Sequence, residues 1–403
     1  MSSRGSLRRG VAATVGQLRG DGRGWLFVVV TVGWLFAIGT RVVFPALLPQ
    51  VRAALALDLT TAGLVLTALW VAYAVSQFPG GVLGDRFGER AILAASAAVA
   101  TGGLVLAAVA PDLRVFVAGT VVFGVGTGLY STPRMTVLSD VYPRAAATAI
   151  GVSQAAGNVG TAALPVVAGL LAATALGWRG GIGFAALPFA AVVAGLWLTV
   201  PRRTSSAAVP DAERSFRSML GGILRPGPLL VFAVMLAMSV VYQGFTSFYP
   251  TYLVTEKGLS NGTAALLFGL FFATGVVIQP LMGTASDRIG TRVALVGCVV
   301  TTTGALVVLT LADGLLVLVP LTVLLGVQLG FWPVVNAHAI TLLPTAVQGS
   351  GFGLIRTAYL LLAATAPAGI GALADAGLFD EAFLLLAVSA GVALVFVLRL
   401  PTD

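Results

Sequence analysis

Two arginines lie deep inside long apolar segments of the sequence, where charged side chains are rare. Arg41 lies in the segment 25–48 and Arg356 in the segment 347–373. A buried ionisable side chain is costly unless it faces protein or water, so each arginine is a candidate functional residue. All fifteen acidic residues fall at segment ends, in loops or in tails, so neither arginine has a carboxylate at its own depth. Because guanidinium binds a carboxylate or phosphate through two hydrogen bonds, the pair predicts a site for a small organic anion.

The elements that carry these arginines are predicted to be membrane-spanning helices. The 403 residues are 58% hydrophobic and only 9% charged, with a mean hydropathy of +1.00, whereas a soluble domain carries about 25% charged residues. The lipid bilayer is therefore the expected solvent, and the alternative for each arginine is contact with headgroups or backbone carbonyls. Apolar segments long enough to cross it, without the alternation of a barrel strand, occur at 25–48, 61–83, 91–110, 115–138, 146–174, 181–200, 228–253, 262–283, 293–312, 315–341, 347–373 and 379–398.

The basic residues predict how these helices are oriented. With the N-terminus inside, sixteen of the 23 Lys and Arg residues fall in cytoplasmic segments and four outside, while Arg41, Arg134 and Arg356 lie within spans. This bias predicts a multi-pass protein of the cytoplasmic membrane with both termini in the cytoplasm. Arg134 lies near the cytoplasmic end of its span and is expected to reach the interface. Since the net charge of +8 is spread over short loops, no nucleic-acid partner is expected.

Few residues remain that could perform catalysis or bind metal. Cys298 and His338 are the single cysteine and the single histidine, and Lys257, the sole lysine, lies in a predicted external loop. An enzyme within the membrane would need a nucleophile with a base, or a set of metal ligands, inside the spans. We therefore expect no enzyme, no cofactor and no metal site, and no retinal bound to a buried lysine.

An internal repeat divides the chain into two halves. The sequence at 81–90 recurs at 283–292, and the same offset of 202 links Gln77 to Gln279 and Pro165 to Pro367. Six spans separate the copies, which predicts two parallel repeats about an axis along the membrane normal. The expected organisation is a cytoplasmic tail (1–24), a six-helix bundle (25–200), a surface linker (201–227) and a second six-helix bundle with a short tail (228–403). The residues shared by the two motif copies are Gly81, Asp85, Arg86, Gly88 and Arg90, matched by Gly283, Asp287, Arg288, Gly290 and Arg292.

The motif at 81–90 resembles the Gly-x-Leu-x-Asp-Arg-x-Gly-x-Arg pattern of the major facilitator superfamily, found between its second and third helices. The resemblance covers the span count, the repeat, the linker and both motif copies. It implies an all-α fold of twelve transmembrane helices in two bundles related by a pseudo-two-fold axis. It also implies a gating role, latching the cytoplasmic side, for residues Gly81, Asp85, Arg86, Gly88, Arg90, Asp287, Arg288 and Arg292.

The same resemblance gathers the candidate binding residues around one central cavity, because helices 1, 5, 7 and 11 line it in that fold. The repeat offset maps Arg41 onto Gln243 and Arg356 onto Gln154, so each half contributes one arginine and one glutamine from these helices. We expect these four residues to converge on the solute. Other residues that could line the cavity are Tyr130, Tyr242, Trp332, Asn336 and Tyr359.

The predicted function is secondary transport of a small organic anion, a carboxylate or a phosphorylated compound, by alternating access. H+ and Na+ are the candidate coupling ions, and a monomer in the lipid bilayer is expected. The stretch from Arg41 to Pro49 and the basic residue in the eleventh span resemble the organic-acid branches of the superfamily, such as oxalate/formate-like and monocarboxylate carriers. Oxalate carriers also have a basic residue in helix 8, and helix 8 of this chain (263–283) has none, which argues against a dicarboxylate. The alternatives are an exporter of neutral or amphipathic compounds and a sensor that retains the fold without transport.

Overall fold

The computed structural model describes residues 23–143, 145–204, 225–343 and 348–400. Within these ranges the chain is helical and contains no strand. Twelve helices of described residues are long and apolar enough to cross a membrane, which confirms the predicted all-α membrane fold. The predicted tail 1–24 lies almost wholly outside the described residues, as does most of the predicted linker 201–227.

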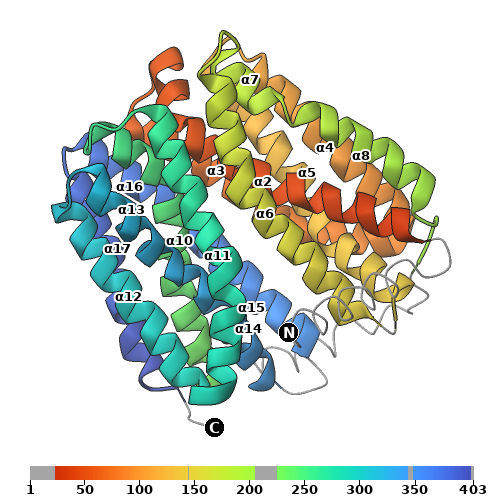
Figure 1. Ribbon diagram of the computed structural model, residues 1–403. Coiled ribbons are helices and arrows are strands. Elements are labelled where there is room, and N and C mark those ends of the chain that lie inside the picture. Colours follow the sequence, from red (N-terminus) through yellow and green to blue (C-terminus); the bar gives the residue numbers. More distant parts are fainter. Residues whose placement is uncertain (1–22, 144, 205–224, 344–347, 401–403) are drawn as a thin grey trace, which may run out of the picture.

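The N-terminal half forms the first six spans, labelled as in Figure 1. Most of them extend beyond the predicted segments. The first helix continues well past residue 48, because Pro45 and Pro49 lie inside it without ending it, as helices in a membrane bundle allow. The spans are α2 (Gly24–Leu55), α3 (Leu59–Phe87), α4 (Glu89–Ala108), α5 (Leu113–Val141), α6 (Ala146–Ala172) and, as one interrupted span, α7 (Gly177–Gly183) with α8 (Ala186–Thr199).

The C-terminal half forms the other six spans, two of which are interrupted. The tenth span narrows to a 3-10 turn, η2, and the eleventh is divided after Ala363. Side-chain directions change at such interruptions, so a regular helix drawn through the predicted segment misplaces the residues beyond it. The elements are α10 (Pro226–Thr255), α11 (Asn261–Ile289), α12 (Thr291–Leu311), α13 (Leu315–Gly326) with η2 (Val327–Gly330) and α14 (Phe331–Thr341), α15 (Gln348–Ala363) with α16 (Ala366–Asp375), and α17 (Phe379–Val397).

Figure 1 shows α2 to α8 as one bundle and α10 to α17 as a second. The repeat is visible in how equivalent helices begin. Asp58 Oδ1 accepts a hydrogen bond from the Thr61 amide at 2.6 Å at the start of α3. Ser260, 202 positions later, accepts one from the Thr263 amide at 3.2 Å at the start of α11. Each side chain satisfies a helix N–H that has no partner within its own helix.

Glycines allow the helices within a bundle to approach closely. A Cβ atom at Gly124 would lie 2.8 Å from the Leu69 carbonyl oxygen, and one at Gly128 would lie 2.4 Å from that of Tyr73. Any larger residue at either position would push α5 away from α3. Small residues at helix interfaces let membrane helices gain van der Waals contact that the lipid would otherwise supply.

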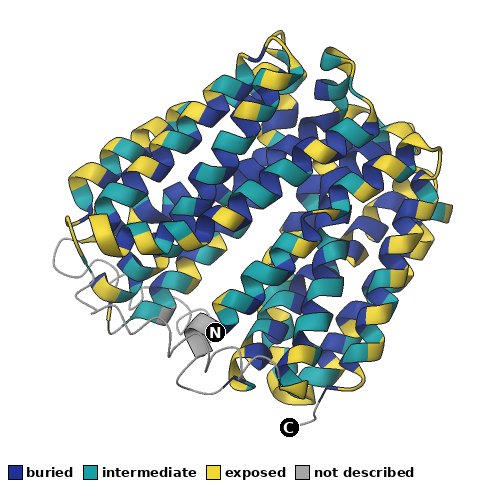
Figure 2. Ribbon diagram, turned by 180° about the vertical axis from the view of Figure 1, so that it is seen from behind, coloured by how far each residue is buried: buried dark blue, intermediate teal, exposed yellow. Residues whose placement is uncertain are grey.

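The two bundles meet at the end of the molecule opposite to the start of α2 and the end of α17. We call this end the far side and the other end the terminal side (Figure 1). On the far side, both carboxylate oxygens of Asp375 accept hydrogen bonds from the first amides of α3, those of Leu59 at 2.8 Å and Thr60 at 2.6 Å. The Ala368 amide also donates to Thr67 Oγ1 at 3.2 Å. Figure 2 shows buried residues concentrated where the bundles meet.

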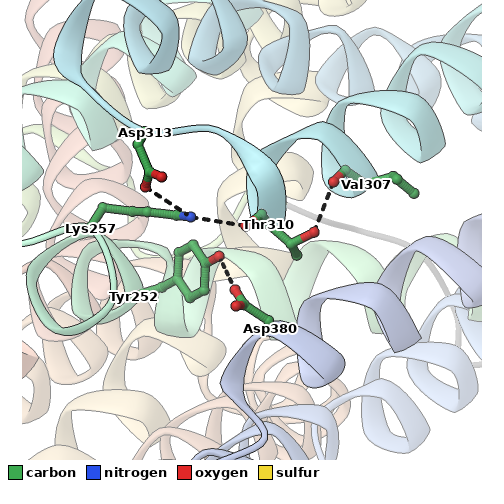
Figure 3. A network of polar contacts seen from close by, with 6 residues as sticks. All are labelled: Tyr252, Lys257, Val307, Thr310, Asp313 and Asp380. Carbon is green, nitrogen blue, oxygen red and sulfur yellow. Dashed lines mark hydrogen bonds and ion pairs between the residues drawn. The ribbon is translucent and has the colours of Figure 1, made fainter.

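A separate polar network connects helix ends on the far side of the C-terminal bundle (Figure 3). Lys257, which follows α10, lies 3.5 Å from Asp313 and donates a hydrogen bond to the Thr310 carbonyl at 3.0 Å. The Tyr252 hydroxyl donates to Asp380 at the start of α17. The network therefore connects the end of α10 with the α12–α13 connection and with α17, and it lies within one bundle.

Candidate functional site

A cavity of about 420 Å³ lies between the two bundles. The N-terminal bundle contributes side chains from α2, α3, α5 and α6, and the C-terminal bundle contributes from α10, α11, η2, α14 and α15. Two arginines line it, and no aspartate or glutamate is among its described lining residues. No group of three or more metal-ligating side chains is placed to hold an ion in the part of the chain that the structure describes.

Arg41 lies in the cavity wall and rests on aromatic rings. Its side chain is 3% exposed, and its Cζ atom lies 3.6 Å from the centre of the Tyr73 ring and 5.4 Å from that of Trp70. A guanidinium over an aromatic face is stabilised by the negative charge of that face, more strongly when water is excluded. Its Nε atom has no hydrogen-bond partner. Arg41 is therefore directed neither to the lipid headgroups nor to a main-chain oxygen recorded in the structure.

The other three residues of the predicted set also line the cavity. Arg356 enters from α15, Gln154 from α6 and Gln243 from α10. The Gln243 Nε2 atom donates to the Leu360 carbonyl at 3.3 Å, while its buried Oε1 atom has no partner. The structure thus brings together the two arginine–glutamine pairs related by the repeat.

Aromatic side chains form a continuous wall across both halves of the cavity. The Trp70 and Tyr242 rings meet edge to face at 6.5 Å, and Tyr242 meets Trp332 in the same way at 6.1 Å. Trp332 is then stacked with Tyr359 at 6.0 Å, with an interplanar angle of 22°. Since Trp70 belongs to the N-terminal bundle and the others to the C-terminal bundle, the wall crosses between the two.

Of the two predicted lining residues not yet described, Asn336 and Tyr130, only Asn336 lines the cavity. Asn336 lines the cavity from α14, and its Oδ1 atom is buried without a partner. Tyr130 lies outside the lining: it is 1% exposed, and its hydroxyl donates to the Val30 carbonyl at 3.0 Å inside the N-terminal bundle. A Cβ atom at Gly33 would overlap that hydroxyl, so Tyr130 fills the space left by the glycine.

Arg134 corrects one sequence expectation. It does not extend to the membrane interface, because it is 1% exposed within the N-terminal bundle. Its Cζ atom lies 3.9 Å from the centre of the Trp34 ring, and its Nη1 atom donates to Ser153 at 2.8 Å. The prediction was wrong because Trp34 on α2 and Ser153 on α6, both distant in sequence, provide buried partners for the charge.

The family of the chain follows from comparison with known proteins. A model of the Major Facilitator Superfamily matches residues 29–266 and 252–403, which together span both bundles. The chain belongs to the major facilitator superfamily. The predicted resemblance is therefore confirmed.

Two relatives within the superfamily align with most of the chain. One is a hexuronate transporter of Bacillus subtilis, 24% identical over 380 residues, which cover 87% of this chain and 89% of the relative. Another is a probable sulfoacetate transporter of Cupriavidus necator, 25% identical over 405 residues and covering 90% of each chain. Both are transporters by name.

Solved structures of the superfamily confirm the fold. A bacterial homologue of the human lysosomal transporter Spinster superposes with a TM-score of 0.80 at 16% identity, covering 94% of this chain and 97% of the other. A D-xylose–proton symporter superposes with a TM-score of 0.74 at 16% identity, covering 93% and 96%. At these identities the similarity concerns the fold and does not extend to the solute.

Most of the superfamily motif belongs to a helix, although the resemblance placed the motif between the second and third helices. Helix α3 continues to Phe87, so residues 81–87 belong to it and Gly88 alone links it to α4. Gly88 has a φ of +89°, and a Cβ atom there would lie 2.2 Å from the Arg202 carbonyl oxygen, so only glycine fits this tight connection. Gly290 repeats the link between α11 and α12, also with a φ of +89°.

The charged residues of the motif lie on the terminal side. Arg90 donates to the Trp197 carbonyl near the end of α8 at 3.5 Å, and its counterpart Arg292 donates to the Leu398 carbonyl after α17. These arginines neutralise helix ends within their own bundles. The other charged residues of the motif are exposed: Asp85 and Arg86 on α3, with their counterparts Asp287 and Arg288 on α11.

Several lining residues were not anticipated from the sequence. Trp34, Trp70 and Tyr73 escaped notice because aromatic residues in apolar helices usually pack in a core. Asn158 and Gln279 also line the cavity, where Asn158 Nδ2 donates to Gln279 Oε1 at 2.8 Å across the two bundles. The signal for Gln279 was available, since the repeat relates it to Gln77 and a glutamine is costly in lipid.

Proposed function

We propose that this superfamily member is a secondary transporter of the cytoplasmic membrane whose solute is a small organic anion bound in the central cavity. The observation that carries the proposal is a pair of arginines, one from each bundle, in a cavity with no acidic residue among its described lining. A carboxylate or phosphate of the solute supplies the charge that the protein lacks there. The relatives named for hexuronate and sulfoacetate support this, because both compounds are anions.

The position of the cavity between the two bundles supports transport by alternating access. With the termini in the cytoplasm, as the basic residues predict, the far side faces outward and is closed by contacts such as that of Asp375 with α3. The solute then exchanges with the cytoplasm in this state and with the outside after the bundles rock. The motif around Asp85 and Arg86 would latch the terminal side in the opposite state, and the protein works as a monomer.

The test combines binding with charge removal. Purified protein is melted in the presence of glucuronate, sulfoacetate, inorganic phosphate or glucose, since a ligand of the folded state raises the melting temperature as its concentration rises. An anion should stabilise the protein and glucose should not. Arg41→Gln and Arg356→Gln should each weaken anion binding about tenfold or more, which corresponds to roughly 1.4 kcal/mol for one charged hydrogen-bonding partner.

The control for this series is Arg114→Gln, because Arg114 is exposed outside the cavity. It should bind the anion as the unmodified protein does. Neutral compounds that bind equally to the protein and to both cavity variants would contradict an anionic solute and favour an exporter of neutral compounds. The coupling ion, H+ or Na+, is identified by imposing each gradient separately on liposomes that contain the protein.

A further inference from the structure

Some of the amide groups that line the cavity are already hydrogen-bonded within the protein. Asn158 and Gln279 are hydrogen-bonded to each other, and the Gln243 amide group donates to Leu360. A sugar acid has several hydroxyls, and each one that loses water without gaining a partner weakens binding. Gln243 Oε1, Asn336 Oδ1 and Ser239 Oγ remain without a partner, so the polar groups by themselves do not decide between a sugar acid and another carboxylate.

The aromatic wall is the feature that favours a flat, unsaturated body. The rings of Trp70, Tyr242, Trp332 and Tyr359 are joined by contacts of 6.0 to 6.5 Å. Trp332 and Tyr242 are only partly buried, so part of each ring is accessible from the cavity. An aromatic ring placed against such a wall gains stacked or edge-to-face contact in addition to the burial of its apolar area.

The positive charge of Arg41 lies beside this aromatic wall. Arg41 has one face of its guanidinium against Tyr73, and the Trp70 ring, 5.4 Å away, belongs both to the surroundings of Arg41 and to the wall. A guanidinium that is stacked by its face still has its N–H groups directed outward in the plane, where a carboxylate can accept two of them. Stacking also holds the group in one orientation, so less entropy is lost when the anion binds.

We infer that the solute is an aromatic carboxylate, with its carboxylate on Arg41 and its ring against Trp332, Tyr242 and Tyr359. This inference rests on the proposed anion transport, and it narrows the class of solute from organic anions in general to aromatic carboxylates. It distinguishes the chain from its relative named for hexuronate, whose solute has no aromatic ring.

The binding test uses three carboxylates of similar size: benzoate, cyclohexanecarboxylate and glucuronate. Benzoate and cyclohexanecarboxylate have the same charge and the same number of ring carbons, and only the first is flat and aromatic. We expect benzoate to bind about fivefold more tightly than cyclohexanecarboxylate, as ring–ring contact contributes beyond buried area, and more tightly still than glucuronate. Uncharged benzamide should bind weakly.

A series of variants tests whether the aromatic wall causes the preference for benzoate over cyclohexanecarboxylate. Trp332→Leu should remove most of the benzoate preference over cyclohexanecarboxylate, while Trp332→Phe keeps it, and Tyr359→Leu with Tyr359→Phe provides a second pair if Trp332→Leu does not fold. The matched control is Trp25→Leu, because Trp25 is 73% exposed and lies outside the cavity.

Three results would overturn the inference, and they have different meanings. If glucuronate or cyclohexanecarboxylate binds as tightly as benzoate and the binding depends on Arg41, the aromatic preference is refuted and anion transport stands. If no carboxylate binds, or if benzamide binds as well as benzoate, a carboxylate solute is refuted, and the phosphate and sulfoacetate arms of the preceding test then decide whether the solute is an anion. Loss of benzoate preference in Trp25→Leu would also refute the role of the wall.

Discussion

Each of two deeply buried arginines in the N-terminal bundle rests on the face of an aromatic ring. Arg41 is stacked on Tyr73, and Arg134 on Trp34. Such stacking stabilises a cation in a membrane interior without a neighbouring carboxylate. The two sites differ in their surroundings, because Arg41 lines the cavity whereas Arg134 is enclosed and bonded to Ser153. This difference supports the proposed role of Arg41 in solute binding and indicates a structural role for Arg134.

Replacing Arg134 with lysine tests this division. A lysine ammonium cannot stack flat on Trp34 while it reaches Ser153 in the same geometry. Arg134→Lys should lower the free energy of unfolding by about 1–3 kcal/mol, measured as a lower melting temperature of the purified protein. The exposed control Arg114→Lys should melt like the unmodified protein. Equal melting temperatures for both variants would show that the planar guanidinium is not needed at position 134.

At the scale of helices, the far side is closed by α3 and α16 in close contact. A Cβ atom at Gly63 would lie 2.3 Å from the Pro367 carbonyl oxygen, and one at Gly371 would lie 2.2 Å from that of Leu59. Asp375, at the end of α16, then caps the start of α3. Because a helix N-terminus carries partial positive charge, the carboxylate stabilises the closed far side.

Asp375→Asn should weaken this closure. An amide retains one acceptor oxygen but loses the charge, which for an exposed group near a helix N-terminus is worth about 1 kcal/mol, or roughly a fivefold change in population. Labelling of a Thr67→Cys variant by a membrane-impermeant thiol reagent should become correspondingly faster from the far side. Asp112→Asn is the control, since Asp112 caps α5 within one bundle through the Val115 amide at 3.0 Å. An equal change in labelling for the two variants would argue against a gating role for Asp375.

At the scale of the whole molecule, transport requires the two bundles to separate where they now meet. The hydrogen bond between the Ala368 amide and Thr67 spans this contact at 3.2 Å, whereas the network around Lys257 lies within one bundle and can move with it. Rocking of rigid bundles therefore breaks the first contact and leaves the second intact.

A cross-link across the far side tests the motion. Cys298 is the only native cysteine and is fully buried, so cysteines can be introduced without removing others. Thr67→Cys combined with Ala368→Cys, joined by a short bifunctional thiol reagent, should abolish net transport in liposomes while ligand binding to the cavity persists. Each single variant treated with the reagent should still transport. Full transport by the cross-linked protein would contradict alternating access through this side.

The sequence alone determined where the membrane spans lie and which residues of the two halves correspond, because both depend on local composition and its repetition along the chain. Long apolar segments predict spans because the bilayer has a fixed thickness, and the offset of 202 pairs Arg41 with Gln243 and Arg356 with Gln154, all four of which line the cavity. The tertiary structure decided which direction each side chain takes. Arg134 and Tyr130 lie inside the bundle because of Trp34, Ser153 and Val30, residues far away in sequence. Depth along a helix can be counted from sequence, but the partner that a side chain meets depends on packing between distant helices.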